Sequence, residues 1–304
     1  PGQGSQAVGM LDAWGDHPAV AATLAEASAA LGEDIAALIK NGPKEQLDLT
    51  TNTQPVMLAA AVACYRAWMA ETGLAPALVA GHSLGEYSAL VAAGSLTLAD
   101  ALPLVRFRAQ AMQEAVPVGV GAMAAILGLD SEVVRVTCAE VAAAVGEPVE
   151  AANFNDPKQI VIAGTKGAVD QACEALKGRG AKRALPLAVS APFHSSLIKP
   201  AAERLQERLL SVTLRTPAIP LVNNIDVAVQ TDPDAIREAL YRQAFGPVRW
   251  VEVVQAIRAR GATHLFECGP GKVLAGLARR IDASLVVGNV LDPATLAEAK
   301  GLLQ

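Results

Sequence analysis

The 304-residue sequence lacks features that define several large classes of protein. It has no long uninterrupted apolar run, because charged residues break every hydrophobic stretch, and no signal peptide is recognisable. This predicts a soluble, cytoplasmic protein. A formal net charge of −5 provides no basic footprint for general nucleic-acid binding. Internal repeats and low-complexity segments are also absent.

Cysteine is scarce as well. The four cysteines are scattered over apolar segments, at Cys64, Cys138, Cys173 and Cys268. None belongs to a C-x-x-C pair, so the pattern indicates buried thiols rather than disulfides or zinc ligands. We therefore expect no metal site.

Apolar periodicity predicts an α/β fold made of a large body and a small insertion. Helices are expected at residues 17–31, 54–70, 86–93, 98–114, 131–144, 166–177, 197–210, 233–244, 251–260 and 273–281 and from 293. Strands are expected at residues 76–80, 122–127, 149–154, 160–163, 183–189, 219–224, 264–268 and 285–290. Residues 118–190 then read βαββαβ, a ferredoxin-like subdomain. Residues 1–117 and 191–304 would form an α/β-hydrolase-like body with a mostly parallel sheet.

One stretch of the body carries a chemical signature. Residues 81–85 read G-H-S-L-G, between an apolar strand and an alanine-rich helix. In a G-x-S-x-G turn the flanking glycines let the backbones pass closely, while the serine hydroxyl is exposed at the helix N-terminus. Ser83 is therefore a candidate nucleophile, the alternative being a serine that caps an ordinary turn.

A serine nucleophile needs a base, and the chain has four histidines. His17 lies in a predicted surface turn, and His264 reads as a strand residue. His82 adjoins Ser83, so its side chain leaves in another direction and could support the pocket. His194 remains, directly after the subdomain, and junctions between domains are where binding sites form.

The base in turn needs a partner on its other ring nitrogen. Asp130, Asp156 and Asp170 all fall within the predicted subdomain, and none stands at the end of a body strand. A main-chain carbonyl can accept the same hydrogen bond, so the acid can be absent.

Six segments together resemble a known family. They are residues 1–6 (PGQGSQ), 81–87 (GHSLGEY), 105–108 (VRFR), 153–155 (NFN), 192–195 (PFHS) and 266–272 (FECGPGK). In this order they are similar to the malonyl-CoA:acyl carrier protein transacylases of bacterial fatty-acid synthesis, along essentially the whole chain.

The resemblance implies roles for individual residues. Ser83 would become malonylated, with His194 as its general base and acid. Arg108 would hold the malonyl carboxylate bidentately. Taken alone, Arg108 is one of several arginines on a predicted helix, for which a surface role is the simpler interpretation.

Further roles follow from the same resemblance. The main-chain amides of Gln3 and Leu84 would form the oxyanion hole. A backbone carbonyl in the segment matching residues 246–250, assigned to Arg249, would orient the histidine. Lys182 and Arg183 would contact the acidic carrier protein, although a solvated basic turn explains them equally well.

The implied reaction uses malonyl-CoA and an acyl carrier protein, with no metal or redox cofactor, and we expect a monomer. Two other interpretations stay open. A serine thioesterase or esterase would share Ser83 and His194 but has no use for Arg108. A non-catalytic module that docks carrier proteins would be free to lose any of the three residues, whereas all three are present. A carrier from polyketide rather than fatty-acid synthesis also fits.

Overall fold

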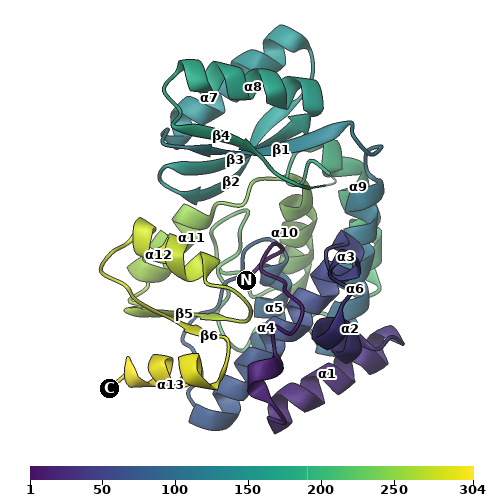
Figure 1. Cartoon of the computed structure of the whole chain (residues 1–304), viewed down its shortest axis with the longest axis vertical. Helices are drawn as coiled ribbons and strands as arrows, with labels where there is room; N and C mark the ends of the chain where they lie inside the picture. The colour runs from purple at the N-terminus through teal and green to yellow at the C-terminus, as the bar shows by residue number, and fades with distance from the viewer. Residues whose placement is uncertain (190) are drawn as a thin grey trace.

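The computed structural model describes residues 1–189 and 191–304 and combines helices with short strands (Figure 1). This agrees with the predicted α/β class. No helix in these two ranges is both long and apolar enough to cross a membrane.

Helices make up the first third of the chain. They are η1 (Asp12–Trp14), α1 (Pro18–Leu31), α2 (Ile35–Asn41), α3 (Lys44–Leu47), α4 (Thr50–Thr72), α5 (Gly85–Ala92) and α6 (Leu98–Glu114). Most of α4 is buried because it is apolar on all sides, and it runs through the largest hydrophobic core, with α1 and α6 packed on it. The sequence did not predict α2 and α3, which are seven and four residues long and too short to display a helical period.

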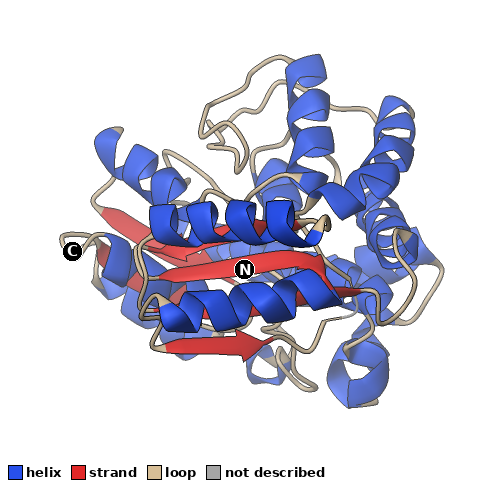
Figure 2. Cartoon of the chain, turned by 90° about the horizontal axis from the view of Figure 1, so that it is seen from above, coloured by secondary structure: helices blue, strands red, loops and turns tan. Residues whose placement is uncertain are grey.

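The middle of the chain forms a small sheet covered by two helices. Its elements are β1 (Gly121–Leu127), α7 (Ser131–Val145), β2 (Val149–Asp156), β3 (Gln159–Thr165), α8 (Lys166–Gly178) and β4 (Arg183–Pro186). The strands are ordered β2-β3-β1-β4, and every neighbouring pair is antiparallel. Figure 2 shows the two helices over one face, toward which Ala124 and Ile126 point, while Met123 packs on the opposite face. The last strand ends at Pro186, three residues before its predicted end.

The rest of the chain returns to the body. Its elements are η2 (Ser196–Ile198), α9 (Lys199–Leu210), α10 (Pro233–Phe245), α11 (Trp250–Ala259), β5 (His264–Cys268), α12 (Val273–Ile281), β6 (Val286–Val290) and α13 (Pro293–Gly301). β5 and β6 pair in parallel. The strands predicted at 76–80 and 219–224 are represented by a single parallel bridge between Val79 and Leu221. Parallel pairing in the described body is therefore less extensive than expected.

Body and subdomain meet along β2. The amide of Phe154 donates to the carbonyl of Val248, and the amide of Val248 donates to the carbonyl of Ala152, both at 2.9 Å. Arg280 on α12 also donates to Asp156 at 2.7 Å. These bonds anchor the outer strand of the small sheet to the body just above α11 and α12 (Figure 1).

The predicted division into residues 1–117, 118–190 and 191–304 stays a prediction. Separate hydrophobic clusters do occur within the small sheet with its helices and within the body. The last boundary falls on Ser190, which lies outside the described residues.

Candidate active site

Close backbone packing holds the turn that carries Ser83. A Cβ on Gly81 would lie 1.8 Å from the carbonyl oxygen of Gly85, and a Cβ on Gly85 would lie 2.9 Å from the carbonyl oxygen of Pro1. Only residues without a Cβ fit at these distances. Ser83 itself has a φ of 52°, in the left-handed region, and α5 begins two residues later. This is the geometry expected of the five-residue motif.

His194 lies beside Ser83, although the two are far apart in the sequence. Its Nε2 is 2.7 Å from the Ser83 hydroxyl oxygen, and its Nδ1 is 2.9 Å from the main-chain oxygen of Gln243. A carbonyl can only accept, so Nδ1 carries the proton and Nε2 is free to accept from the serine hydroxyl. Burial, reinforced by the nearby Arg108 cation, lowers the pKa of His194 to about 3. The imidazole is therefore neutral at physiological pH, as a general base must be.

The carbonyl that orients His194 is not the one predicted. The assignment to Arg249 is wrong, because the carbonyl belongs to Gln243 in the last turn of α10. Carbonyls in a last helical turn have no partner within the helix, so this one is available to the imidazole. The Arg249 side chain instead pairs with Glu252 at 2.6 Å and donates to the Ile225 carbonyl.

No carboxylate contacts His194 among the described residues, as the sequence allowed. The three aspartates considered for that role pair with cations: Asp130 with Lys158 at 2.6 Å, Asp156 with Arg280 at 2.7 Å and Asp170 with Lys166 at 2.8 Å. The serine, imidazole and main-chain carbonyl thus form the hydrogen-bonded series without an acid.

Arg108 brings a buried cation to the nucleophile. It lies on α6, is 1% exposed, and its Nη2 is 3.2 Å from the Ser83 hydroxyl oxygen. Its Nη1 donates to the side-chain oxygen of Gln54 at 2.8 Å, and Nη2 donates to that of Gln243 at 3.1 Å. Burial lowers the pKa of Arg108, yet a guanidinium stays charged in proteins. No carboxylate in the described chain forms an ion pair with it.

The sequence analysis missed Asn224, which clamps the serine turn. Its side-chain oxygen accepts from the Ser83 amide at 2.7 Å, and its side-chain nitrogen donates to the Gly81 carbonyl at 2.6 Å. Its main-chain amide donates to the Glu86 side chain at 2.9 Å. The only available signal was its place at the end of a predicted strand, where polar side chains often face a site.

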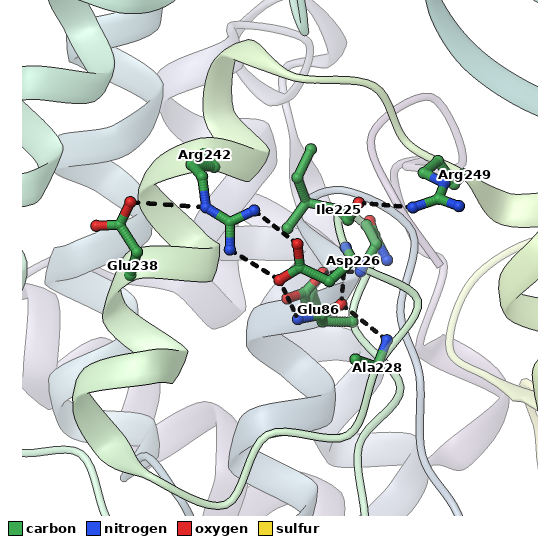
Figure 3. A network of polar contacts seen from close by, with 9 residues as sticks. Glu86, Ile225, Asp226, Ala228, Glu238, Arg242 and Arg249 are labelled. Atoms are coloured by element: carbon green, nitrogen blue, oxygen red, sulfur yellow. Dashed lines mark hydrogen bonds and ion pairs between the residues drawn. The ribbon is translucent and has the colours of Figure 1, made fainter.

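An ion pair and a hydrogen bond to the main chain brace the loop that presents this asparagine (Figure 3). Arg242 on α10 holds the Asp226 carboxylate through both terminal nitrogens, at 2.6 and 2.8 Å. Arg249 donates to the Ile225 carbonyl from the other side at 3.2 Å. The loop is therefore fixed at two consecutive residues next to the clamp.

The chain start packs against the serine turn. A Cβ on Gly2 would lie 3.1 Å from the His82 carbonyl oxygen, and the Gln3 side chain donates to Thr50 at 3.1 Å. Leu84 is the residue that precedes the first turn of α5. Leu84 directly follows Ser83, and Gln3 directly follows the glycine that packs on the turn. Their role in binding an oxyanion stays a prediction.

Lys182 and Arg183 are exposed where the chain enters β4. Neither forms an ion pair with any described residue. Both are available to an anionic partner, and their contact with a carrier protein stays a prediction.

The other histidines have local partners. His17 lies near Glu71 at 3.2 Å, and His264 lies near the Leu302 carbonyl at 3.0 Å. His82 lies 2.8 Å from the side-chain oxygen of Asn155 on β2. The described ranges hold no group of three or more histidine, cysteine or acidic residues that could bind a metal ion. The arrangement around Ser83 is that of covalent acyl chemistry at a serine, beside a cation suited to a carboxylate.

Comparison with known proteins supports this assignment. The family described as acyl transferase domain matches residues 1–280. The malonyl CoA-acyl carrier protein transacylase of Escherichia coli K12 is 53% identical over 300 residues, which cover 98% of this chain and 96% of that protein. That of Bacillus subtilis 168 is 45% identical over 297 residues, covering 97% and 93%.

Solved structures agree. The crystal structure of acyl-carrier-protein S-malonyltransferase from Burkholderia pseudomallei 1710b is 65% identical, with a TM-score of 0.96, and the alignment covers 98% of this chain and 97% of that one. A malonyl-transacylase in complex with its type II PKS acyl carrier protein is 51% identical, with a TM-score of 0.96 and coverages of 98% and 96%. The chain therefore belongs to the acyl transferase domain family, among the malonyl CoA-acyl carrier protein transacylases.

Proposed function

We propose that the chain transfers the malonyl group of malonyl-CoA to the phosphopantetheine thiol of an acyl carrier protein. The intermediate is a malonyl ester of Ser83. The observation that carries the proposal is the unpaired Arg108 guanidinium, 3.2 Å from the Ser83 hydroxyl oxygen. A cation at this distance suits an acyl group that ends in a carboxylate.

In the first half-reaction the Ser83 oxygen attacks the thioester carbonyl while His194 Nε2 takes the hydroxyl proton. The Gln243 carbonyl holds the Nδ1 proton and stabilises the imidazolium that forms. The amides of Gln3 and Leu84 would bind the developing oxyanion. The C–S bond then breaks, and His194 returns its proton to the departing CoA thiolate.

The second half-reaction runs the same steps in the opposite direction. His194 takes the proton of the carrier's phosphopantetheine thiol, and the sulfur attacks the ester carbonyl of malonyl-Ser83. The C–O bond breaks, and the serine oxygen recovers the proton from His194. The chemistry needs no metal or redox cofactor, because the thiol that accepts the acyl group arrives with the carrier.

Lys182 and Arg183 are proposed to meet the acidic carrier, because both are exposed cations with no ion pair in the described chain. The relative solved with a type II PKS acyl carrier protein supports a carrier partner of this kind. A monomeric state and a cytoplasmic location remain expectations from the sequence.

We also infer the fold type of the subdomain and of the body. The order βαββαβ with strands arranged β2-β3-β1-β4 supports a ferredoxin-like subdomain. The parallel pairing of β5 with β6 and the Val79–Leu221 bridge support a hydrolase-like body.

Intact-protein mass after brief mixing with malonyl-CoA or acetyl-CoA tests the function. We expect a malonyl adduct on the wild type and none on Ser83→Ala. Arg108→Ala should lower the preference for malonyl over acetyl by roughly 100-fold, because charge-assisted hydrogen bonds to the carboxylate are lost. Arg215→Ala, a change of an exposed arginine, is the matched control and should keep the preference.

Two outcomes would contradict the proposal. Steady release of free CoA without an adduct would indicate a thioesterase. An absence of both adduct and CoA release would indicate a docking module without turnover.

A further inference from the structure

Gln243 contacts the nucleophile, the base and the cation of the proposed acyl-transfer site. Its main-chain oxygen accepts from His194, and its side-chain oxygen accepts from Arg108. Its side-chain nitrogen donates to the Ser83 carbonyl at 2.9 Å and to the Glu86 carboxylate at 3.3 Å. The residue is completely buried. The main-chain bond explains why a carbonyl must be here, but not why the side chain should be glutamine.

The surroundings fix which way the side-chain amide points. A guanidinium can only donate, so the amide oxygen must face Arg108. A main-chain carbonyl can only accept, so the amide nitrogen must face Ser83, and the Glu86 oxygen lies on that same side. A flipped amide would turn its nitrogen toward one donor, Arg108, and its oxygen toward two acceptors, the Ser83 carbonyl and Glu86.

A neutral amide is also the right chemistry beside this cation. Gln54 and Gln243 each accept from a different terminal nitrogen of Arg108, so they fix the guanidinium plane without neutralising its charge. Glu86 carries the nearby carboxylate, but the Gln243 amide lies between it and the guanidinium. Arg108 is thereby oriented while its charge remains available to a ligand.

We propose that the Gln243 side chain is a positioning group that holds Arg108 in the orientation needed to bind the acyl carboxylate, and that Glu86 and the Ser83 carbonyl fix the amide for this task. The inference rests on the proposed malonyl transfer. It assigns to Gln243 a part in choosing the acyl group, separate from its main-chain contact with His194. Substitution of the side chain removes its contact with Arg108 but keeps the main-chain carbonyl that accepts from His194.

The test compares Gln243→Met, which keeps the approximate volume but makes no hydrogen bond, with the wild type and with Gln206→Met. Gln206 is an exposed glutamine on α9 and serves as the matched control. Single-turnover acylation by malonyl-CoA and by acetyl-CoA gives the ratio of the two kcat/KM values. We expect Gln243→Met to lower this ratio about tenfold, the loss of one hydrogen bond to a charged group, and Gln206→Met to leave it unchanged.

Gln243→Glu is the second variant, because its shape is conserved and it avoids a cavity. Its carboxylate would pair with Arg108 and occupy the cation, so the ratio should fall here too, and mainly through a higher KM for malonyl-CoA. The double variant Arg108→Ala/Gln243→Met should have a malonyl-to-acetyl ratio within about twofold of that of Arg108→Ala alone. Gln243 acts through the Arg108 guanidinium, which both proteins lack.

Three results would overturn the proposal. The first is an unchanged ratio in a folded Gln243→Met protein, and the second is a Gln243→Glu protein that keeps its malonyl preference. The third is an equal fall in the ratio with and without Arg108. A purely structural glutamine would slow both acyl donors alike and lower the melting temperature. If the wild type itself formed no malonyl ester, the proposed function would fail first, and that outcome is read from the wild type alone.

Discussion

Ser83 and His194 both hold a backbone conformation that is costly for residues with a side chain. Their φ angles are 52° and 60°, in the left-handed region. Such residues persist only where their surroundings determine the backbone, and they are concentrated at functional sites. Asn224 supplies that constraint for Ser83, because its side-chain oxygen accepts a hydrogen bond from the Ser83 amide. The strain places the hydroxyl and the imidazole against each other.

Burial of His194 makes the stability of the protein depend on pH. The folded pKa of about 3 lies below the ordinary value of 6.5. Below pH 6.5 the unfolded chain therefore takes up a proton that the folded protein refuses, and the free energy of unfolding falls as pH falls. At pH 5 this one group costs about 2 kcal/mol. Urea unfolding of His194→Gln should accordingly show a shallower loss of stability between pH 6.5 and pH 5.

Two other buried groups, His82 and Glu86, also contribute to the pH dependence of stability in this range. Burial lowers the pKa of His82 to about 4, which acts in the same direction as His194. Burial raises the pKa of Glu86 to about 7, so stability from this group is lost as pH rises from about 4.5 to 7, the opposite direction. Between pH 6.5 and pH 5 the unfolded wild type should bind about one proton more than the folded wild type, and the unfolded variant almost none more than the folded variant. The free energy of unfolding should therefore fall with pH in the wild type and stay nearly constant in the variant. Equal slopes for the two proteins would rule out a buried neutral His194.

At this scale the sequence indicated the reacting groups but not their supports. A serine between two glycines, a histidine after a domain junction and an arginine in a family motif can be recognised from residue type and position. Gln243 and Asn224 cannot, because an amide is uninformative until its partners are known. For Asn224 those partners are Gly81 and Ser83, which lie far away in the sequence.

Among the elements, long helices were the most predictable. The helix expected at 98–114 matches α6 (Leu98–Glu114) at both ends, because Thr97 caps its start and the chain reaches Pro117 soon after its end. Strands were less predictable, since the one expected at 76–80 is reduced to a bridge at Val79. Strand length depends on pairing with distant segments, which a local pattern does not contain.

The serine turn offers a test at the scale of elements. Gly81→Ala would place a methyl group 1.8 Å from the Gly85 carbonyl oxygen, so the strand end and α5 must separate. We expect a loss of more than about 3 kcal/mol in the free energy of unfolding, measured in urea, together with loss of acylation. Gly178→Ala is the control: it lies at the end of α8, and apart from its chain neighbours and its own helix backbone no atom comes within 4 Å of the added carbon. It should change stability by less than about 1 kcal/mol. A Gly81→Ala protein as stable as this control would refute the close-packed turn.

Across the whole molecule, the small sheet is attached at one side. β2 pairs with β3 and also bonds to the body through Val248, whereas β4 pairs with β1 alone. Local stability follows the number of such constraints. Amide hydrogen exchange followed by mass spectrometry should therefore be at least about tenfold slower in residues 149–156 than in residues 183–186.

Arg280→Ala sharpens this comparison. It removes the bond to Asp156 and should speed exchange in β2 while leaving β4 unchanged. Equal protection of the two outer strands in the wild type would mean that β4 has a constraint that the described contacts do not include.

The unpaired guanidinium of Arg108 has a consequence for the molecule as a whole. A buried cation with no ion-pair partner in the described chain lowers conformational stability, and a carboxylate bound beside it offsets that cost by linkage. The empty protein is therefore less resistant to unfolding than the protein that carries a malonyl ester. The protein thus alternates in each catalytic cycle between a less stable free form and a more stable acylated form. While the ester exists, the acyl carboxylate stabilises the fold as a buried ion-pair partner would.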